Sequence, residues 1–215
     1  MKYLGEGFYY CVYEAGENRV FKKFQPYWFS FKKIYEFSRK RADTPILKSI
    51  IDAHRARIAE KNALIIMKVK LQKMSLALFA NPEFIPNRLD YYQDKVVILD
   101  DFFQKNNIEI NKKIIDKYIE LLKFFWSYGF HDKTFKLQPN YGVGKDGEIV
   151  CVDFGECVFK KEQALQSILS KKWLSRGSYK NWKDEALKKY YTEQMGQIMT
   201  KNNLDSTWAS SSRNL

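Results

Sequence analysis

The sequence predicts an α+β fold with two lobes, a small antiparallel β-sheet that carries one helix and a reduced, mostly helical part. Two patterns support this prediction. Residues 2–24 alternate in polarity and are rich in aromatic side chains, as half-buried strands are. Residues 114–126 place apolar side chains on one face of a helix. We expect the sheet lobe at 1–72, the helical lobe at 73–204 and a flexible tail at 205–215.

The first lobe is expected to hold five strands and one helix. Three strands fall within residues 2–24. Ser30 is the predicted N-cap of a helix over Phe31–Arg41. Two further strands are predicted at about Ala53–Ile58 and Ala63–Leu71, which completes a five-stranded antiparallel sheet.

The second lobe is expected to be built on helices. Asn111 is the predicted N-cap of the first, and Gly129 its C-terminal cap. The buried face of this helix is expected to consist of Ile114, Ile115, Tyr118, Ile119, Leu122, Phe125 and Trp126. A hairpin turning at residues 144–147 follows, and its second strand, 148–152, leads into Asp153. Another amphipathic helix is predicted at roughly 180–200.

Composition favours a globular protein with reduced thiols. Hydrophobic residues make up 45% of the 215 and aromatic residues 16%, enough for a packed core. Cys11, Cys151 and Cys157 form no CxxC pair. With only His54 and His131, no histidine-rich metal site is expected. The chain has neither an apolar signal segment nor eighteen apolar residues in a row, so we expect a cytoplasmic protein without a membrane span; secretion by a route without an apolar signal stays open.

The chain is basic, with a formal charge of +12 from 37 lysine and arginine residues against 25 acids. Such a charge suits an acidic partner, an anionic lipid or nucleic acid, and it also suits a solvated lysine-rich surface, which we favour. No nucleic-acid-binding motif accompanies the charge, so nucleic acid is not supported as a partner.

Two glycines and a lysine in the predicted sheet suggest phosphate binding. Gly5 and Gly7 lie between two strands, where glycine lets the main chain close over phosphates because no side chain blocks it. A tight turn is the alternative interpretation. Lys22 shares a strand face with Val20, since side chains alternate, and its ammonium can reach phosphates held under the loop. We assign Val12 and Val20 to nucleotide binding with them.

Asn140 and Asp153 are the candidate metal ligands. They lie at the two ends of the predicted hairpin, which delivers an amide and a carboxylate to one place. Mg²⁺ is a hard ion that prefers such oxygen ligands. A surface hairpin with an Asp-containing turn is the alternative, but the strand before Asp153 is apolar, and a carboxylate at the end of a buried strand generally has a partner or an ion.

In this order, the features resemble the protein-kinase-like superfamily, over residues 4–156. The match covers the glycine loop, the strand-three lysine, the catalytic-loop region and the DFG triplet, here Gly5 and Gly7, Lys22, His131-Asp132 to Asn140, and Asp153-Phe154-Gly155. The compact size and the segment around Trp173 and Trp182 resemble small bacterial kinase-like proteins of the PhoP-regulated YrbL type. The resemblance implies a two-lobed fold, ATP and Mg²⁺ as cofactors, and transfer of the γ-phosphoryl group.

The catalytic loop departs from that pattern. Asp132 lies eight residues before Asn140 instead of five, and Phe135 occupies the expected position of the base. We expect Asp132 to accept a proton from the acceptor hydroxyl; capping of local backbone is the alternative. Lys136 is expected to stabilise charge on the transferring phosphoryl group. Tyr10 replaces the third glycine of the loop.

Glu36 is the expected partner of Lys22, because it is the only acid in the predicted helix Phe31–Arg41. Downstream of Gly155 there is neither an A-P-E sequence nor a long activation segment, so regulation through such a segment is not expected.

Three functions remain open on these residues: an ATP-dependent kinase, which we favour, a nucleotide-binding pseudokinase, and an enzyme that transfers AMP. A histidine–aspartate phosphohydrolase is rejected, because His54 and His131 are too few to bind its metal ions. The acceptor is expected to be a hydroxyl group, on a protein by preference, with a sugar, an aminoglycoside or a lipid headgroup as alternatives. The tail serines within Ser206–Ser212 are candidate autophosphorylation sites.

Overall fold

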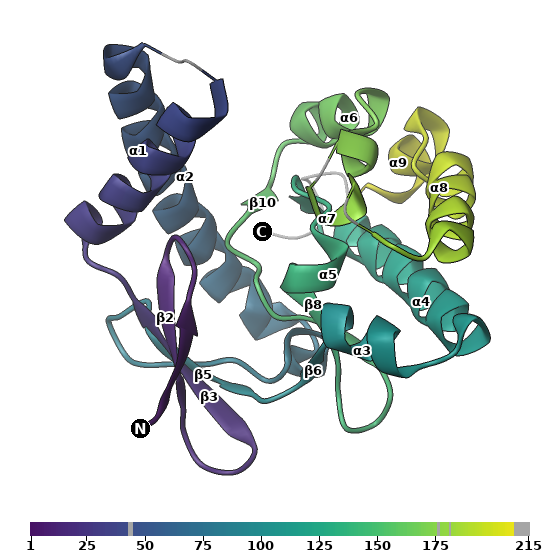
Figure 1. Ribbon diagram of the computed structural model, residues 1–215, viewed down its shortest axis with the longest axis horizontal. Helices are drawn as coiled ribbons and strands as arrows, with labels where there is room; N and C mark the ends of the chain where they lie inside the picture. The colour runs from purple at the N-terminus through teal and green to yellow at the C-terminus, as the bar shows by residue number, and fades with distance from the viewer. Residues whose placement is uncertain (43–44, 176, 181, 209–215) are drawn as a thin grey trace. The chain divides into compact units, whose positions relative to one another are not determined.

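The structure is a computed structural model that describes residues 1–42, 45–175, 177–180 and 182–208. It is an α+β protein with a small antiparallel sheet and several helices (Figure 1). The chain divides into two compact units, Met1–Lys95 and Val96–Leu215.

The first unit is built on a five-stranded antiparallel sheet, as predicted. The strand order is β1-β2-β3-β5-β4. Its strands are β1 (Tyr3–Glu6), β2 (Tyr10–Glu14), β3 (Arg19–Phe24), β4 (Glu83–Phe84) and β5 (Tyr91–Asp94). The three strands predicted within residues 2–24 are therefore confirmed, whereas the last two strands come from a later segment than predicted.

The predicted strands at Ala53–Ile58 and Ala63–Leu71 are wrong. A single 25-residue helix, α2 (Ile46–Lys70), covers both segments. It packs side by side with α1 (Tyr27–Ala42), which contains the predicted helix but begins earlier (Figure 1). Ser30 is accordingly not an N-cap, because it lies inside α1 and its hydroxyl donates to the Pro26 carbonyl at 3.2 Å.

The first unit extends beyond residue 72, where the sequence placed its end. After α2 come two short 3₁₀ helices, η1 (Leu71–Lys73) and η2 (Leu76–Phe79). The strands β4 and β5 then pair with each other, and β5 pairs with β3. Since the sheet is incomplete without these strands, the compact unit reaches Lys95.

The second unit is mostly helical. Its helices are α3 (Leu99–Lys105), α4 (Ile108–Ser127), α5 (Leu137–Asn140), α6 (Lys161–Leu169), η3 (Lys172–Ser175), α7 (Gly177–Lys180), α8 (Glu185–Ile198) and α9 (Lys201–Thr207). Its short strands are β6 (Val97–Ile98), β7 (His131–Asp132), β8 (Tyr141–Val143), β9 (Ile149–Cys151) and β10 (Cys157–Val158). They form a three-stranded sheet, β6-β8-β9, and a β10-β7 pair.

Helix α4 forms the core of the second unit. All seven side chains predicted for its buried face are buried. Helices α8 and α9 and strands β7 and β9 pack against it. Its C-terminal end is as predicted, since Gly129 has φ +69° and its N–H donates to the Trp126 carbonyl at 2.9 Å. Its N-cap is Asn107, not Asn111, because Asn107 accepts a hydrogen bond from Ile110 N at 3.0 Å.

The predicted hairpin is present as β8 and β9, and the helix predicted at roughly 180–200 is α8. The predicted tail begins inside α9, so residues 205–207 are helical. Ser206 donates to the Asn203 carbonyl at 3.1 Å; the serines after it lie outside the described residues. Among the described residues, no helix is long and apolar enough to span a membrane.

Candidate functional site

The glycine hairpin joins β1 to β2. Gly5 pairs with Val12 at a bulge and has φ +157°, which L side chains rarely adopt, and Gly7 N donates to the Tyr10 carbonyl at 2.9 Å. A Cβ atom built at Gly5 or Gly7 would meet nothing within 4 Å. Packing within the described residues therefore does not require either glycine, and there is space beside the backbone at both positions.

Helix α1 holds this hairpin in place. Lys33 forms an ion pair with Glu6 at 2.5 Å and also donates to the Gly7 carbonyl at 3.3 Å. The hydrogen bond from Lys33 to the Glu6 carboxylate lowers the pKa of Glu6. Gln25 donates to the same carbonyl at 3.2 Å. The loop position is thus set by two side chains that bind one carbonyl oxygen.

Lys22 lies in the middle of the sheet. Strand β3 pairs it with Val12 on one side and with Tyr91 on the other. Its Nζ atom lies 5.6 Å from the centroid of the Tyr91 ring, which is almost fully buried. Val20, two residues earlier, pairs with Gln93. Lys22 is therefore a partly buried lysine next to the glycine hairpin strand.

A buried acid that the sequence analysis missed lies on α2. Glu60 is 2% exposed, whereas Glu36 is on the surface, 4.0 Å from Lys32. Arg57, one turn before Glu60, lies over the Phe24 ring at 3.9 Å. Residues three apart share a helix face, so Glu60 lies on the same buried face of α2 as Arg57. No sequence pattern could have found it, because its segment was predicted to be a turn between strands.

Asp132 is buried in β7, and both of its carboxylate oxygens accept hydrogen bonds. Oδ1 accepts from Thr134 N at 2.7 Å and from the Thr134 hydroxyl at 2.6 Å, and Oδ2 accepts from the Tyr141 hydroxyl at 2.9 Å. Burial raises the pKa of Asp132, which these hydrogen bonds oppose. These hydrogen bonds fit the alternative role of Asp132, capping of local backbone, better than the role of a base.

His131, the residue before Asp132 in β7, is hydrogen-bonded to helix α4. Its Nδ1 atom accepts from Trp126 Nε1 at 3.0 Å, and burial lowers its pKa to about 3. The Nε2 atom has no hydrogen-bond partner among the described residues. Phe135, which occupies the expected base position, has φ +50°. The centroid of its ring lies 4.9 Å from that of His131 and 5.5 Å from that of Trp173.

Glu156 connects two predicted site residues. Its Oε2 atom accepts from Lys136 Nζ at 2.6 Å and from Asn140 Nδ2 at 3.4 Å. Lys136 and Asn140 also lie on one turn, since Asn140 N donates to the Lys136 carbonyl at 3.1 Å. Glu156 was not predicted as a site residue, although its position directly after the Asp153-Phe154-Gly155 triplet could have suggested it.

The hairpin brings the main chains of Asn140 and Asp153 together, and their role as metal ligands stays a prediction. The Asn140 carbonyl accepts from Val152 N at 2.8 Å and from Asp153 N at 3.3 Å. Asp153 is half-buried, between the buried strand β9 and the fully buried Phe154. Among the described residues, no group of three or more His, Cys, Asp or Glu side chains could hold a metal ion. An amide and a carboxylate do suit Mg²⁺, which keeps waters or phosphates as its other ligands.

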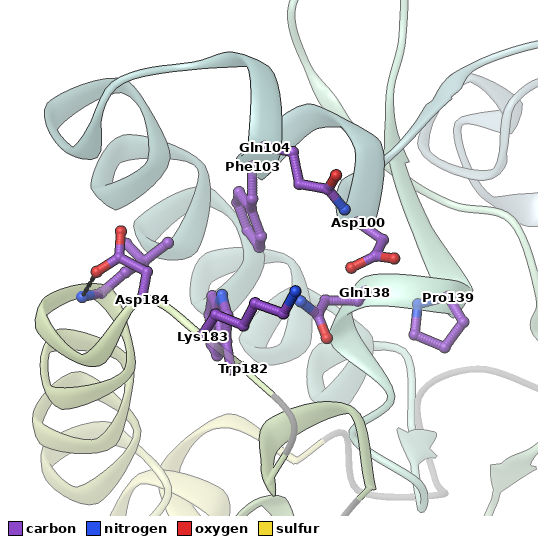
Figure 2. A pocket seen from close by; sticks show the side chains of 9 residues that line it. Asp100, Phe103, Gln104, Gln138, Pro139, Trp182, Lys183 and Asp184 are labelled. Atoms are coloured by element: carbon purple, nitrogen blue, oxygen red, sulfur yellow. Dashed lines mark hydrogen bonds between the residues drawn. The ribbon is translucent and has the colours of Figure 1, made fainter.

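A pocket of about 670 Å³ lies within the second unit, next to helix α5, which ends at Asn140 (Figure 2). Helix α5 contributes Gln138 and Pro139 to it, and Figure 2 shows Gln104 and Asp100 of α3 on the same side of the pocket. Phe103 and Trp182 stack with their ring centroids 5.4 Å apart. The pocket thus combines an aromatic wall with amide and carboxylate groups.

The predicted approach of Lys22 to Asn140 and Asp153 joins residues of different units and stays a prediction. The roles of Gly5, Gly7, Val12, Val20 and Lys136 likewise stay predictions.

Comparison with known proteins identifies no family. No protein-family model and no curated protein matches the chain. Among solved structures, the chain is similar to that in a crystal structure of WbdD, with a TM-score of 0.44 and 15% identity over 92% of this chain. It spans 46% of the length of that chain.

Proposed function

We propose that this chain is an ATP- and Mg²⁺-dependent phosphotransferase that moves the γ-phosphoryl group to a hydroxyl acceptor. One observation carries the proposal. The main chain of Asn140 accepts a hydrogen bond from Asp153 N, so an amide and a carboxylate leave neighbouring backbone positions. Both are oxygen donors of the type that Mg²⁺ binds together with phosphate.

The first unit would supply the phosphate-binding groups. The space beside the backbone at Gly5 and Gly7 would let phosphate oxygens approach the loop. Lys22 would provide the positive charge, and Val12 on β2 and Val20 on β3 would contact the nucleotide. In this proposal Glu60 replaces Glu36 as the partner of Lys22, because Glu60 is buried and Glu36 is exposed.

The second unit would hold the metal through Asn140 and Asp153. When bound, Mg²⁺ would neutralise charge on the phosphates. Glu156 accepts from the amide nitrogen of Asn140, which leaves the amide oxygen as the atom able to face a cation. Lys136 is held by Glu156 at 2.6 Å and would add positive charge next to that amide.

A second candidate, a nucleotide-binding pseudokinase, is favoured by Asp132. A carboxylate that already accepts three hydrogen bonds is poorly placed to accept a proton from a substrate. Phosphoryl transfer nevertheless depends mainly on positioning and electrostatic stabilisation, so the loss of a base slows transfer without abolishing it. We therefore keep the phosphotransferase as the first candidate and propose that Asp132 acts as loop support.

The acceptor hydroxyl, which we expect on a protein, would be recognised near α5. The pocket lined by Gln138 and Pro139 supports this assignment, because it borders the segment that holds Lys136 and Asn140. Asp100 and Gln104 offer hydrogen-bond partners to a hydroxyl-bearing group there.

Labelled ATP separates the candidates. Transfer of label from γ-labelled ATP, lost in Asp153→Ala, supports the kinase; label from α-labelled ATP indicates AMP transfer; binding without transfer indicates the pseudokinase. Lys22→Ala is expected to weaken ATP binding about tenfold or more, since a charge-assisted hydrogen bond contributes roughly 1.5–3 kcal/mol. Lys23→Ala is the matched control, because Lys23 is exposed on the opposite face of β3. Equal weakening by both changes would show that Lys22 has no specific role.

A further inference from the structure

Helices α1 and α2 expose an unusual amount of apolar surface. Twelve of the nineteen exposed large apolar side chains among the described residues lie between Tyr27 and Val69. Trp28 is 74% exposed and Leu47 is 69% exposed. Soluble proteins rarely expose apolar side chains in such concentration without a partner surface.

On α2 these side chains form one stripe. Leu47, Ile51, Ile58, Ile65 and Val69 are spaced by four or seven residues and are all exposed. This spacing keeps them on one face over 22 residues, about 33 Å of helix. The opposite face of α2 is the buried one and includes Arg57 and Glu60. The apolar stripe therefore does not belong to the core of the first unit.

The start of α1 continues this surface. The Tyr27 hydroxyl and His54 Nδ1 share a hydrogen bond of 2.5 Å, and His54 lies between Ile51 and Ile58 on α2. The Trp28 ring packs against the Tyr27 ring, with the two ring centroids 5.4 Å apart. An exposed tryptophan and a tyrosine thus border the aliphatic stripe. Such amphipathic rings favour the boundary between lipid headgroups and acyl chains.

The same segment is strongly basic. Residues 27–70 contain eleven lysine and arginine residues and four acids, a net charge of +7. This is more than half of the +12 of the whole chain. An amphipathic surface with basic residues around apolar side chains has the chemistry that binds anionic lipids.

A cationic pocket lies next to the stripe. It has a volume of about 480 Å³ and is lined by Arg57, Lys61 and Arg88 together with Ile58 of the stripe. Its one acid, Asp90, is paired with Arg88 and also accepts from Phe24 N. Arg57 is 5% exposed, and its Nε and Nη1 atoms have no hydrogen-bond partner among the described residues. A buried guanidinium with spare donors suits a phosphate group.

We propose that the first unit binds the surface of an anionic membrane. The α2 stripe and Trp28 enter the boundary between headgroups and acyl chains, and the pocket of Arg57, Lys61 and Arg88 receives a lipid phosphate. The attachment is peripheral, because none of the described helices can span a bilayer. The charge of +7 disfavours a second copy as the occupant, since two such surfaces repel each other.

Vesicle binding tests the proposal on the full chain. Sedimentation with vesicles of phosphatidylcholine plus phosphatidylglycerol is expected to capture the protein, and vesicles of phosphatidylcholine alone are expected to capture far less. Raised salt is expected to weaken the binding to the anionic vesicles. No binding to anionic vesicles, or equal binding to both kinds, overturns the proposal.

Variants locate the surface. Leu47→Ser, Ile51→Ser and Ile65→Ser together are expected to reduce binding to anionic vesicles about tenfold or more, because three apolar side chains leave the lipid. These positions are exposed, so circular dichroism and the melting temperature should change little. Leu169→Ser is the matched control, since Leu169 is 66% exposed in the second unit. Lys61→Gln should weaken binding selectively to anionic vesicles.

Two outcomes would reassign the surface. Unchanged vesicle binding by the triple variant excludes the stripe as the lipid contact. Light scattering that shows a dimer of the wild-type protein and a monomer of the triple variant would assign the stripe to a second copy. Asp153→Ala is expected to bind vesicles like the wild type, so failure of the phosphotransferase proposal and failure of this one give different results.

Discussion

Asp132 accepts two hydrogen bonds from Thr134 and one from Tyr141, all within the second unit. If it supports the loop, Asp132→Asn should cost about 1–3 kcal/mol of unfolding free energy, the usual penalty for disturbing a buried hydrogen-bonded group. Phosphoryl transfer, measured well below the melting temperature, should then fall less than about tenfold. A general base is worth roughly 100-fold or more.

Tyr141→Phe is the companion change. It removes one hydrogen bond to Asp132 and keeps the carboxylate. Loop support predicts that both variants lose stability, as measured by urea denaturation, and that neither is severely impaired in transfer. A loss above 100-fold in Asp132→Asn alone would instead restore Asp132 as the base.

His131 gives the stability of the protein a dependence on pH. Burial lowers its pKa to about 3, whereas in the unfolded chain it titrates near 6.5. Below about pH 6.5 the unfolded chain therefore binds a proton that the folded protein does not, so stability falls as pH falls towards 3, by about 1.4 kcal/mol per pH unit. Asp132, whose pKa burial raises, acts in the opposite direction.

The variant His131→Gln isolates the contribution of His131 to the pH dependence of stability. The amide keeps an acceptor for Trp126 Nε1 and does not titrate. Relative to the wild type, the variant should lose the decline in unfolding free energy between pH 6.5 and 5, measured by urea denaturation. His54→Gln is the control, because His54 is the other histidine and is exposed. A slope that survives in His131→Gln and disappears in His54→Gln would contradict the assignment.

Site residues differed in how far the sequence could locate them. Asn140 and Asp153 could be placed together, because one short hairpin sets their separation. Glu60 could not be found, since its burial depends on the packing of α2, and its segment was expected to join two strands. Glu156 was also missed, because its contacts with Lys136 and Asn140 arise from a loop and not from a periodic pattern.

The N-cap of helix α4 is Asn107, whereas Asn111 was the predicted N-cap, and mutations can distinguish the two. Asn107 accepts from Ile110 N, whereas Asn111 is buried and donates to the Phe103 and Asn106 carbonyls at 3.0 and 3.3 Å. Asn107→Ala should cost about 1 kcal/mol and Asn107→Ser almost nothing, because serine is also a good N-cap. Thermal denaturation measures both.

Asn111→Ser provides the contrast. The serine side chain is too short to replace an amide that bridges two carbonyls, so its loss should resemble that of Asn111→Ala, about 1–3 kcal/mol. If Asn111→Ser keeps the wild-type stability and Asn107→Ser does not, the helix begins at Asn111, as the sequence predicted.

Helix α2 shows why an element of this fold escaped prediction. Its buried face contains Arg57 and Glu60, and isoleucine and valine lie on its exposed face. Helix periodicity is normally recognised from apolar residues that face the core. Here the buried face mixes Ala53, Leu64 and Met67 with polar and charged residues, while further apolar residues lie on the exposed side. The β-branched residues Ile65, Ile66 and Val69 favour a strand by propensity.

Across the whole molecule, elements set by local patterns were predicted, and those set by contacts between distant segments were not. The first three strands and α4 were predicted because alternation and helix spacing arise within one segment. The end of the first unit was not, since β4 and β5 return to the sheet after two helices. Pairing between such distant segments depends on tertiary packing that no local pattern reports.

The second unit should fold by itself, because its core comes from its own elements. Helix α4 packs against α8, α9 and β9, and Trp126, Trp173 and Trp182 are buried there. Trp28, in the first unit, is exposed. Tryptophan fluorescence of the whole chain therefore reports mainly on the second unit.

A fragment of residues 96–215 is accordingly expected to keep the blue-shifted emission of buried tryptophan and to unfold in urea as one cooperative transition. Trp28→Phe in the full chain is the control: because it removes an exposed tryptophan, its emission should shift only to the blue, and its urea midpoint should match that of the wild type. A fragment whose emission equals that of the urea-denatured chain would show that the second unit needs the first to fold, because its own core is then insufficient to offset the conformational entropy of its 120 residues.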